Sequence, residues 1–155
     1  REKVKALSPQ TKQMLKQVAA LHNRPSPTLT LRQVMHEVLA DYQSMLAGLA
    51  VDNGAQAADS ARRLANHRIP RGGLVPYFGL DKINDAGLAP LKTFNDQVEG
   101  NALKLAEAAE KGDMVKAATY VGDITTGCVA CHQVFRGQPG VSPRLVNPAS
   151  AAAIK

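Results

Sequence analysis

Apolar side chains recur at intervals of three and four residues in four long segments of the chain, and this spacing predicts amphipathic helices. Aromatic residues make up only 4% of the sequence, and alanine and leucine recur throughout, which favours helices over sheets. We therefore predict an all-α, up-down-up-down four-helix bundle, with a three-helix core and a peripheral fourth helix as the alternative. The predicted helices cover about residues 31–50, 55–68, 90–111 and 114–136.

Local signals predict where these helices begin and end. Thr30 and Gln33 have the spacing of a capping box before the first helix, and Asp113 is an N-cap for the last. Residues 69–85 contain two prolines and three glycines, which predicts the one long loop. The predicted buried stripe of the first helix consists of Leu31, Met35, Val38, Tyr42, Met45 and Leu49. The predicted buried stripe of the last helix consists of Ala117, Val121, Ile124, Cys128, Cys131 and Phe135.

The 155 residues suffice for one domain of ordinary size with flanking segments. Ser8 and Pro9 begin a further helix, which the two prolines in residues 23–28 end. We predict a basic helical extension with its linker, the helical bundle and a tail, at residues 1–29, 30–137 and 138–155.

The net charge of +6 is concentrated near the start of the chain. Within the first 24 residues, six basic side chains against one acidic side chain give +5. This charge predicts a solvated helix face or a docking surface for an acidic partner. Nucleic-acid binding is not expected, because no aromatic residues alternate with the basic ones. No apolar run reaches about 18 residues, so no transmembrane segment is predicted.

The only two cysteines, Cys128 and Cys131, are followed directly by His132. Positions i, i+3 and i+4 of a helix project from one face. A disulfide redox pair usually opens a helix after a strand, and a zinc site needs further ligands that the sequence does not supply at suitable spacing. The motif therefore predicts one covalently attached haem c, with two thioether links and His132 as the proximal iron ligand.

A sixth iron ligand from the protein has to precede the motif, because no methionine or histidine follows His132. In the predicted bundle the motif faces the beginning of the first helix, where Met35 lies, and His67 at the end of the second helix is the rival. Met114 shares the last helix with the motif and is too far away along its axis. The complete set of candidates is Met14, His22, Met35, His36, Met45, His67 and Met114.

The segments LRQVMHEVL (31–39) and GCVACHQVFR (127–136), with the motif on the last helix of a bundle, resemble the class II c-type cytochromes, the cytochrome c′ family. The resemblance is to the low-spin branch and covers about residues 30–137. It implies that Met35 is the sixth ligand and that Arg32 pairs with a haem propionate. It also implies a periplasmic location after removal of a signal peptide, and it allows a homodimer through the first two helices.

Two functions follow from this reasoning. The first is single-electron transfer between redox partners through a six-coordinate Met/His haem. The alternative is a five-coordinate protein that binds or senses NO or CO, in which Met35 only crowds the iron. No catalytic dyad or second cofactor motif is recognisable, so we do not expect an enzyme.

Overall fold

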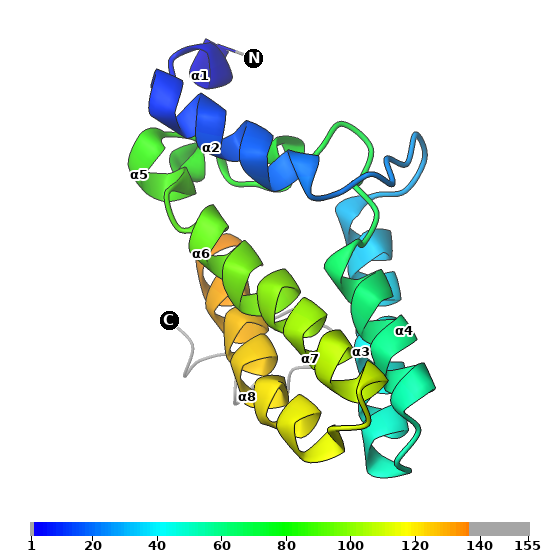
Figure 1. Cartoon of the computed structure of the whole chain (residues 1–155). Helices are drawn as coiled ribbons and strands as arrows, with labels where there is room; N and C mark the ends of the chain where they lie inside the picture. Colours follow the sequence, from blue (N-terminus) through cyan, green and yellow to red (C-terminus); the bar gives the residue numbers. More distant parts are fainter. Residues whose placement is uncertain (1, 137–155) are drawn as a thin grey trace, which may run out of the picture.

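The protein is all-α in the computed structural model, which describes residues 2–136 (Figure 1). No β-strand is present in that part of the chain, and its one isolated bridge pairs Pro25 with Ile69. The helices are α1 (Glu2–Lys5), α2 (Pro9–Ala20), α3 (Leu31–Ala50), α4 (Gly54–Ala65), α5 (Asp85–Leu88), α6 (Leu91–Asn95), α7 (Asn101–Glu110) and α8 (Met114–Cys131). Short 3-10 turns, η1 (Val75–Tyr77) and η2 (Leu80–Lys82), and π-helical turns, η3 (Asp96–Gly100) and η4 (His132–Arg136), connect or extend them.

The predicted helix ends are confirmed where a side chain fixes them. Thr30 and Gln33 form the capping box: each side chain accepts a hydrogen bond from the other residue's backbone N–H, at 3.4 and 2.8 Å. The Asp113 carboxylate accepts a hydrogen bond from the Lys116 N–H and begins α8. Gly112 has a φ of 75°, a left-handed conformation that glycine adopts without strain and that separates α7 from α8.

Three predicted helices differ from the observed ones. The second helix was predicted to end at residue 68, whereas the observed helix α4 ends at Ala65. The third predicted helix is interrupted by the π-turn η3, which separates α6 from α7. The fourth is α-helical only to Cys131 and continues to Arg136 as the π-turn η4, and the predicted tail lies outside the described residues. The long loop is confirmed, although it contains the short turns η1 and η2 and leads into α5.

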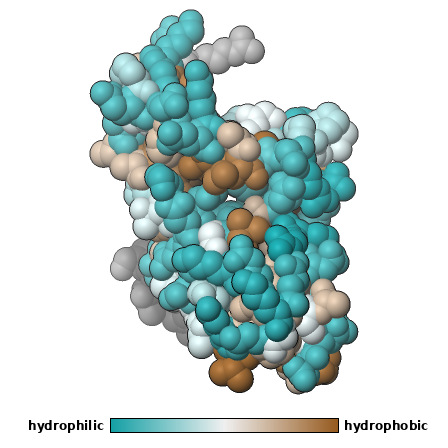
Figure 2. All heavy atoms as spheres, in the orientation of Figure 1, coloured by the Kyte–Doolittle hydropathy of each residue, from teal (hydrophilic) through white to brown (hydrophobic). Residues whose placement is uncertain are grey.

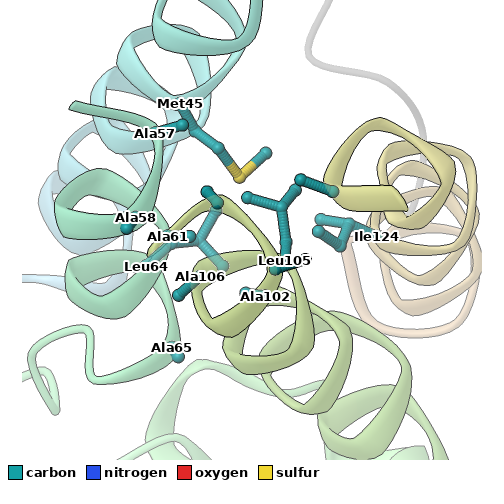
Figure 3. Close-up of a cluster of buried hydrophobic side chains, with 13 residues drawn as sticks. Met45, Ala57, Ala58, Ala61, Leu64, Ala65, Ala102, Leu105, Ala106 and Ile124 are labelled. Carbon is teal, nitrogen blue, oxygen red and sulfur yellow. The ribbon is translucent and has the colours of Figure 1, made fainter. Parts of the chain in front are cut away.

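Neighbouring helices in the sequence are also neighbours in space. α3 packs along α4, α4 along α7, and α7 along α8, whereas α3 and α8 approach each other far less. Figure 3 shows side chains from all four of these helices pointing toward one another in the main core. Alanine and glycine allow the close approaches: a Cβ at Gly48 would lie 2.6 Å from the backbone nitrogen of Ala57. The fully buried members of this core are Met45, Ala57, Ala61, Leu64, Ala102, Leu105, Ala106, Ala117 and Ile124.

The buried stripe predicted for α3 is only partly right. Val34 and Gly48, which we did not assign to the stripe, are buried together with Met45. Leu31, Met35, Val38, Tyr42 and Leu49 are half-buried. The physical reason is that α4 covers one side of α3 while α8 covers little of the other. A hydrogen bond of 2.6 Å between Tyr42 Oη and Thr125 Oγ1 connects α3 and α8.

The N-terminal segment packs against the rest of the described chain. α2 crosses the ends of the long helices (Figure 1), and Figure 2 shows apolar side chains gathered on the surface beneath it. Lys3 Nζ donates a hydrogen bond to the Leu80 carbonyl, and an Arg24 guanidinium nitrogen donates one to the Asn66 carbonyl. A second apolar cluster joins α2 to the long loop, α5, α6 and η4 through Leu7, Met14, Leu15, Phe78, Leu88, Leu91 and Phe135.

Within residues 2–136, none of the helices combines the length and the apolar character needed to cross a membrane.

Candidate functional site

The cysteine motif lies at the C-terminal end of α8. Cys128 and Cys131 are free, half-buried thiols, and Cys128 packs against the main core. His132 is also half-buried and keeps helical dihedral angles (φ −64°, ψ −39°), although the π-turn begins there. Because the backbone stays helical from Cys128 through His132, the three side chains project from the same side of the helix end.

The turn of α8 just before the motif lies against η3. A Cβ at Gly127 would lie 2.7 Å from Val98 Cγ2 and 3.1 Å from Gln97 Cβ, so only glycine allows this approach. The two π-turns of the described chain therefore flank one region: η3 packs against α8, and η4 continues from it. Such turns insert an extra residue into a helix and are frequent at functional sites.

The two thiols are protonated at neutral pH. Burial raises the pKa of the Cys128 thiol, and the negative charge of Glu99 raises it further. Burial, Glu99 and the neighbouring Cys128 raise the pKa of the Cys131 thiol to about 11. Reactive redox cysteines have a depressed pKa in electropositive surroundings, often at a helix N-terminus. The observed environment is the opposite, and it does not suit an activated redox pair.

His132 offers a neutral imidazole. Burial lowers the pKa of this side chain, and the positive charge of Arg136 lowers it further. A metal-ligating histidine has to be unprotonated at the ligating nitrogen. The donor set at the end of α8 is therefore two neutral thiols and one neutral imidazole.

This set fits a c-type haem. Thiols add to vinyl groups and imidazole ligates iron, and both kinds of group are present at the required spacing. The surroundings are apolar and aromatic: Phe135, in the turn after the motif, stacks on Phe78 with ring centroids 4.3 Å apart and meets the edge of Phe94 at 6.2 Å. α3 and α8 contact each other far less than the other neighbouring helices do, so the side of α8 that faces α3 is little covered.

Met35 and Arg32 lie near the beginning of α3, as the sequence predicts. Met35 is half-buried and, among the described residues, belongs to neither apolar cluster. Arg32 is exposed in the first helical turn. Met45 is fully buried in the main core, and Met114 Sδ lies 3.4 Å from the position of a Cβ on Gly54, at the opposite end of α8 from the motif.

His67 belongs to a buried cluster that the sequence did not reveal. Its Nε2 lies 3.3 Å from Glu99 Oε1, and His22 Nε2 lies 3.9 Å from the same oxygen. The two imidazole ring centroids are 4.4 Å apart. Glu99 belongs to η3, which packs against α8, the helix that carries the motif.

The pKa values of the two histidines in this cluster are shifted in opposite directions. Burial lowers the pKa of His22, the nearby His67 lowers it further, and the Val18 carbonyl and Glu99 only partly offset this. Burial alone would also lower the pKa of His67, but its interactions with Glu99 and the Arg68 carbonyl outweigh burial and raise it. The sequence did not indicate Glu99, because this residue lies in the π-turn η3. A π-turn shifts which side chains share one side of a helix, and a regular period of 3.6 residues does not predict that shift.

Comparison of the chain with protein families, with curated proteins and with solved structures gave no match.

Proposed function

We propose that this protein is a monohaem c-type cytochrome that carries single electrons between redox partners in the periplasm and is not an enzyme. The observation that supports the proposal most directly is the arrangement of Cys128, Cys131 and His132: two protonated thiols and a neutral imidazole on one side of the end of α8. A haem bound there supplies an iron that accepts and releases one electron.

The proposed scaffold is an up-down-up-down four-helix bundle with an N-terminal helical extension. Its helices are α3, α4, the α6–η3–α7 segment and α8, and each packs against the next one in the chain. This order of contacts supports the bundle, because short connections place consecutive helices side by side and antiparallel. The main core joins all four helices, and Cys128 of the motif packs against it.

The proposed iron ligands are His132 and Met35. With His132 and Met35 as its ligands, a haem would supply one-electron chemistry at a reduction potential that the methionine raises. Met35 is available for this role, since its half-buried thioether belongs to neither apolar cluster of the described chain. Arg32, exposed one turn earlier, is the proposed partner of a haem propionate. The basic residues of the extension are the proposed docking surface for an acidic redox partner.

A five-coordinate protein that binds NO or CO is the second candidate. The observation that favours it is that Val34, and not Met35, takes the buried position in this turn of α3. In this alternative Met35 restricts access to the iron without ligating it.

The haem itself is tested with the purified protein from a host that attaches haem c. We expect a red protein whose mass equals the polypeptide plus one haem and whose colour survives denaturation. Replacing both Cys128 and Cys131 with serine should abolish the covalent haem. Val129→Ala is the matched control, because Val129 lies between the two cysteines and is 50% exposed. A colourless wild-type protein with the mass of the bare polypeptide would falsify the proposal.

The ligands are tested with two methionine variants on the same helix. Met35→Leu should convert a low-spin spectrum into a high-spin one and allow the reduced protein to bind CO, because leucine conserves volume but cannot ligate iron. Met45→Leu is the control and should leave the spectrum unchanged, since Met45 is buried in the main core. If Met35→Leu leaves the spectrum unchanged and His67→Ala changes it, His67 is the sixth ligand. A wild-type protein that is high-spin and binds CO rapidly is the five-coordinate alternative.

A further inference from the structure

The cluster of His22, His67 and Glu99 is assembled from three separate segments and is not used by the proposed haem site. His22 follows α2, His67 follows α4, and Glu99 belongs to η3. The three side chains are 6%, 14% and 14% exposed, respectively. One ligand atom from each lies within 4.8 Å of the other two. The distances from Glu99 Oε1 to the two Nε2 atoms, 3.3 and 3.9 Å, are close to the separation of about 3.4 Å between ligand atoms that bonds of about 2.1 Å to a tetrahedral ion produce.

The second ring nitrogen of each histidine is already bound to a backbone carbonyl. His22 Nδ1 lies 3.1 Å from the Val18 oxygen, and His67 Nδ1 lies 2.8 Å from the Arg68 oxygen. A carbonyl only accepts, so Nδ1 carries the proton in each neutral ring and Nε2 presents a lone pair. Both lone pairs then face the Glu99 carboxylate, which is also an acceptor. This is the arrangement of metal-ligating histidines, whose other N–H is held by an acceptor.

Two buried polar atoms of this cluster have no hydrogen-bond partner among the described residues. Within residues 2–136, His22 Nε2 and Glu99 Oε2 are both buried and have no hydrogen-bond partner. A single proton between His67 and Glu99 leaves these two atoms unsatisfied, and unsatisfied buried polar atoms are costly. A cation at the centre would satisfy all three side chains together.

We propose that His22, His67 and Glu99 bind one divalent transition-metal ion of the zinc class. Two imidazoles and one carboxylate are a common zinc ligand set, with water or the second carboxylate oxygen completing the coordination. Magnesium and calcium prefer oxygen ligands and do not suit two imidazoles. His67 also lines an open surface pocket of about 240 Å³, together with Arg24, Asp41, Arg63 and Arg68.

The bound ion would fasten the N-terminal extension to the helical body. His22 is the only ligand from the extension, whereas His67 and Glu99 come from the body. Direct contacts already hold the same junction, including hydrogen bonds between Asn23 and Asn66 at 3.2 and 2.8 Å. Metal binding therefore stabilises the docked extension, because the complete ligand set exists only when α2 is in place.

The test is zinc titration calorimetry on the full-length protein after chelator treatment, with any free thiol alkylated. Covalent haem withstands this treatment, so the site is measured whether or not haem is present. We expect one zinc per chain and no magnesium binding. His22→Gln and Glu99→Gln should each weaken zinc binding at least about a hundredfold, since loss of partners outside the ligand set alone costs tenfold to a hundredfold. His36→Gln is the control, because His36 is exposed on α3.

A second measurement does not depend on how the variants fold. X-ray absorption at the zinc edge of the wild-type complex should show two imidazole nitrogens and oxygen donors. The proposal is overturned if the wild-type protein takes up no zinc, if the spectrum shows fewer than two imidazoles, or if folded His22→Gln and Glu99→Gln variants bind as tightly as the wild type.

Discussion

At the scale of single residues, Leu105 and Leu103 on α7 provide a matched test of the main core. Leu105 is fully buried among side chains of the other helices, whereas Leu103 is 43% exposed. Leu105→Ala should lower the free energy of unfolding by about 2–5 kcal/mol, because it removes buried surface and leaves a cavity. Leu103→Ala should change it by less than about 0.5 kcal/mol. Urea denaturation of both variants measures the difference, and equal effects would show that the core is not packed as described.

Some residues could be placed from the sequence and others could not. Met45 and Ile124 belong to the apolar stripes predicted for the first and last helices, and both are fully buried as predicted. Met35 and Val34 lie at the two edges of one face, and periodicity alone does not determine which edge a neighbouring helix covers. In the structure Val34 is buried and Met35 is half-buried.

At the scale of the helices, Gly48 and Gly122 occupy comparable helical positions with opposite surroundings. A Cβ at Gly48 would lie 2.6 Å from the Ala57 nitrogen and 3.1 Å from the Asn53 oxygen, both backbone atoms. Gly48→Ala should force α3 and α4 apart and cost about 1–3 kcal/mol of unfolding free energy. A Cβ at Gly122 would meet no atom within 4 Å. Gly122→Ala should therefore raise the free energy of unfolding by about 0.5–1 kcal/mol, because alanine has the higher helix propensity.

Thermal unfolding of these two variants gives shifts of opposite sign if the helix packing is right. Shifts in the same direction would mean that propensity, and not the close approach of α3 and α4, dominates at Gly48.

The helix ends that a capping side chain or a glycine determines could be predicted, but the π-turns could not. Thr30, Asp113 and Gly112 act through their own hydrogen bonds or backbone dihedral angles, which are local and visible in the sequence. The π-turn η3 lies where Gly127 of α8 approaches Gln97 and Val98, a contact between residues about 30 positions apart. Local patterns carry no information about such contacts, so the third helix was predicted as one regular element.

At the scale of the whole molecule, the cysteine motif could be predicted from the sequence, but the cluster of His22, His67 and Glu99 could not. Cys128, Cys131 and His132 are recognisable because their spacing is local. His22, His67 and Glu99 are 32 or more positions apart and meet only because α2 packs across the ends of the other helices. A spacing rule cannot detect a site that depends on how the extension docks, and we treated that extension as separate from the bundle.

The docking of the extension should weaken in acid, because a carboxylate holds it. Asp85 Oδ1 accepts a hydrogen bond of 3.0 Å from the Ser8 N–H, at the N-cap of α2. Interaction with the Thr11 hydroxyl, followed by the bond from Ser8, lowers the pKa of Asp85 below its usual value of 3.8. Since the pKa is lower in the folded state, the carboxylate stabilises the fold at pH values above its unfolded pKa, and this contribution is lost as the pH falls through the folded pKa.

We therefore expect Asp85→Asn to be less stable than the wild type at pH 7, with the difference shrinking toward zero as the pH falls below about 3.8. Thermal unfolding of both proteins between pH 7 and pH 2 measures this difference. Asp123→Asn removes the same charge from an exposed site on α8 and serves as the control. Its difference from the wild type should not follow this trend, because within the described residues the Asp123 side chain accepts no hydrogen bond from Ser8 or Thr11, as the Asp85 side chain does. A difference for Asp85→Asn that stays constant across the range would show that the hydrogen bonds to α2 do not require the ionised carboxylate.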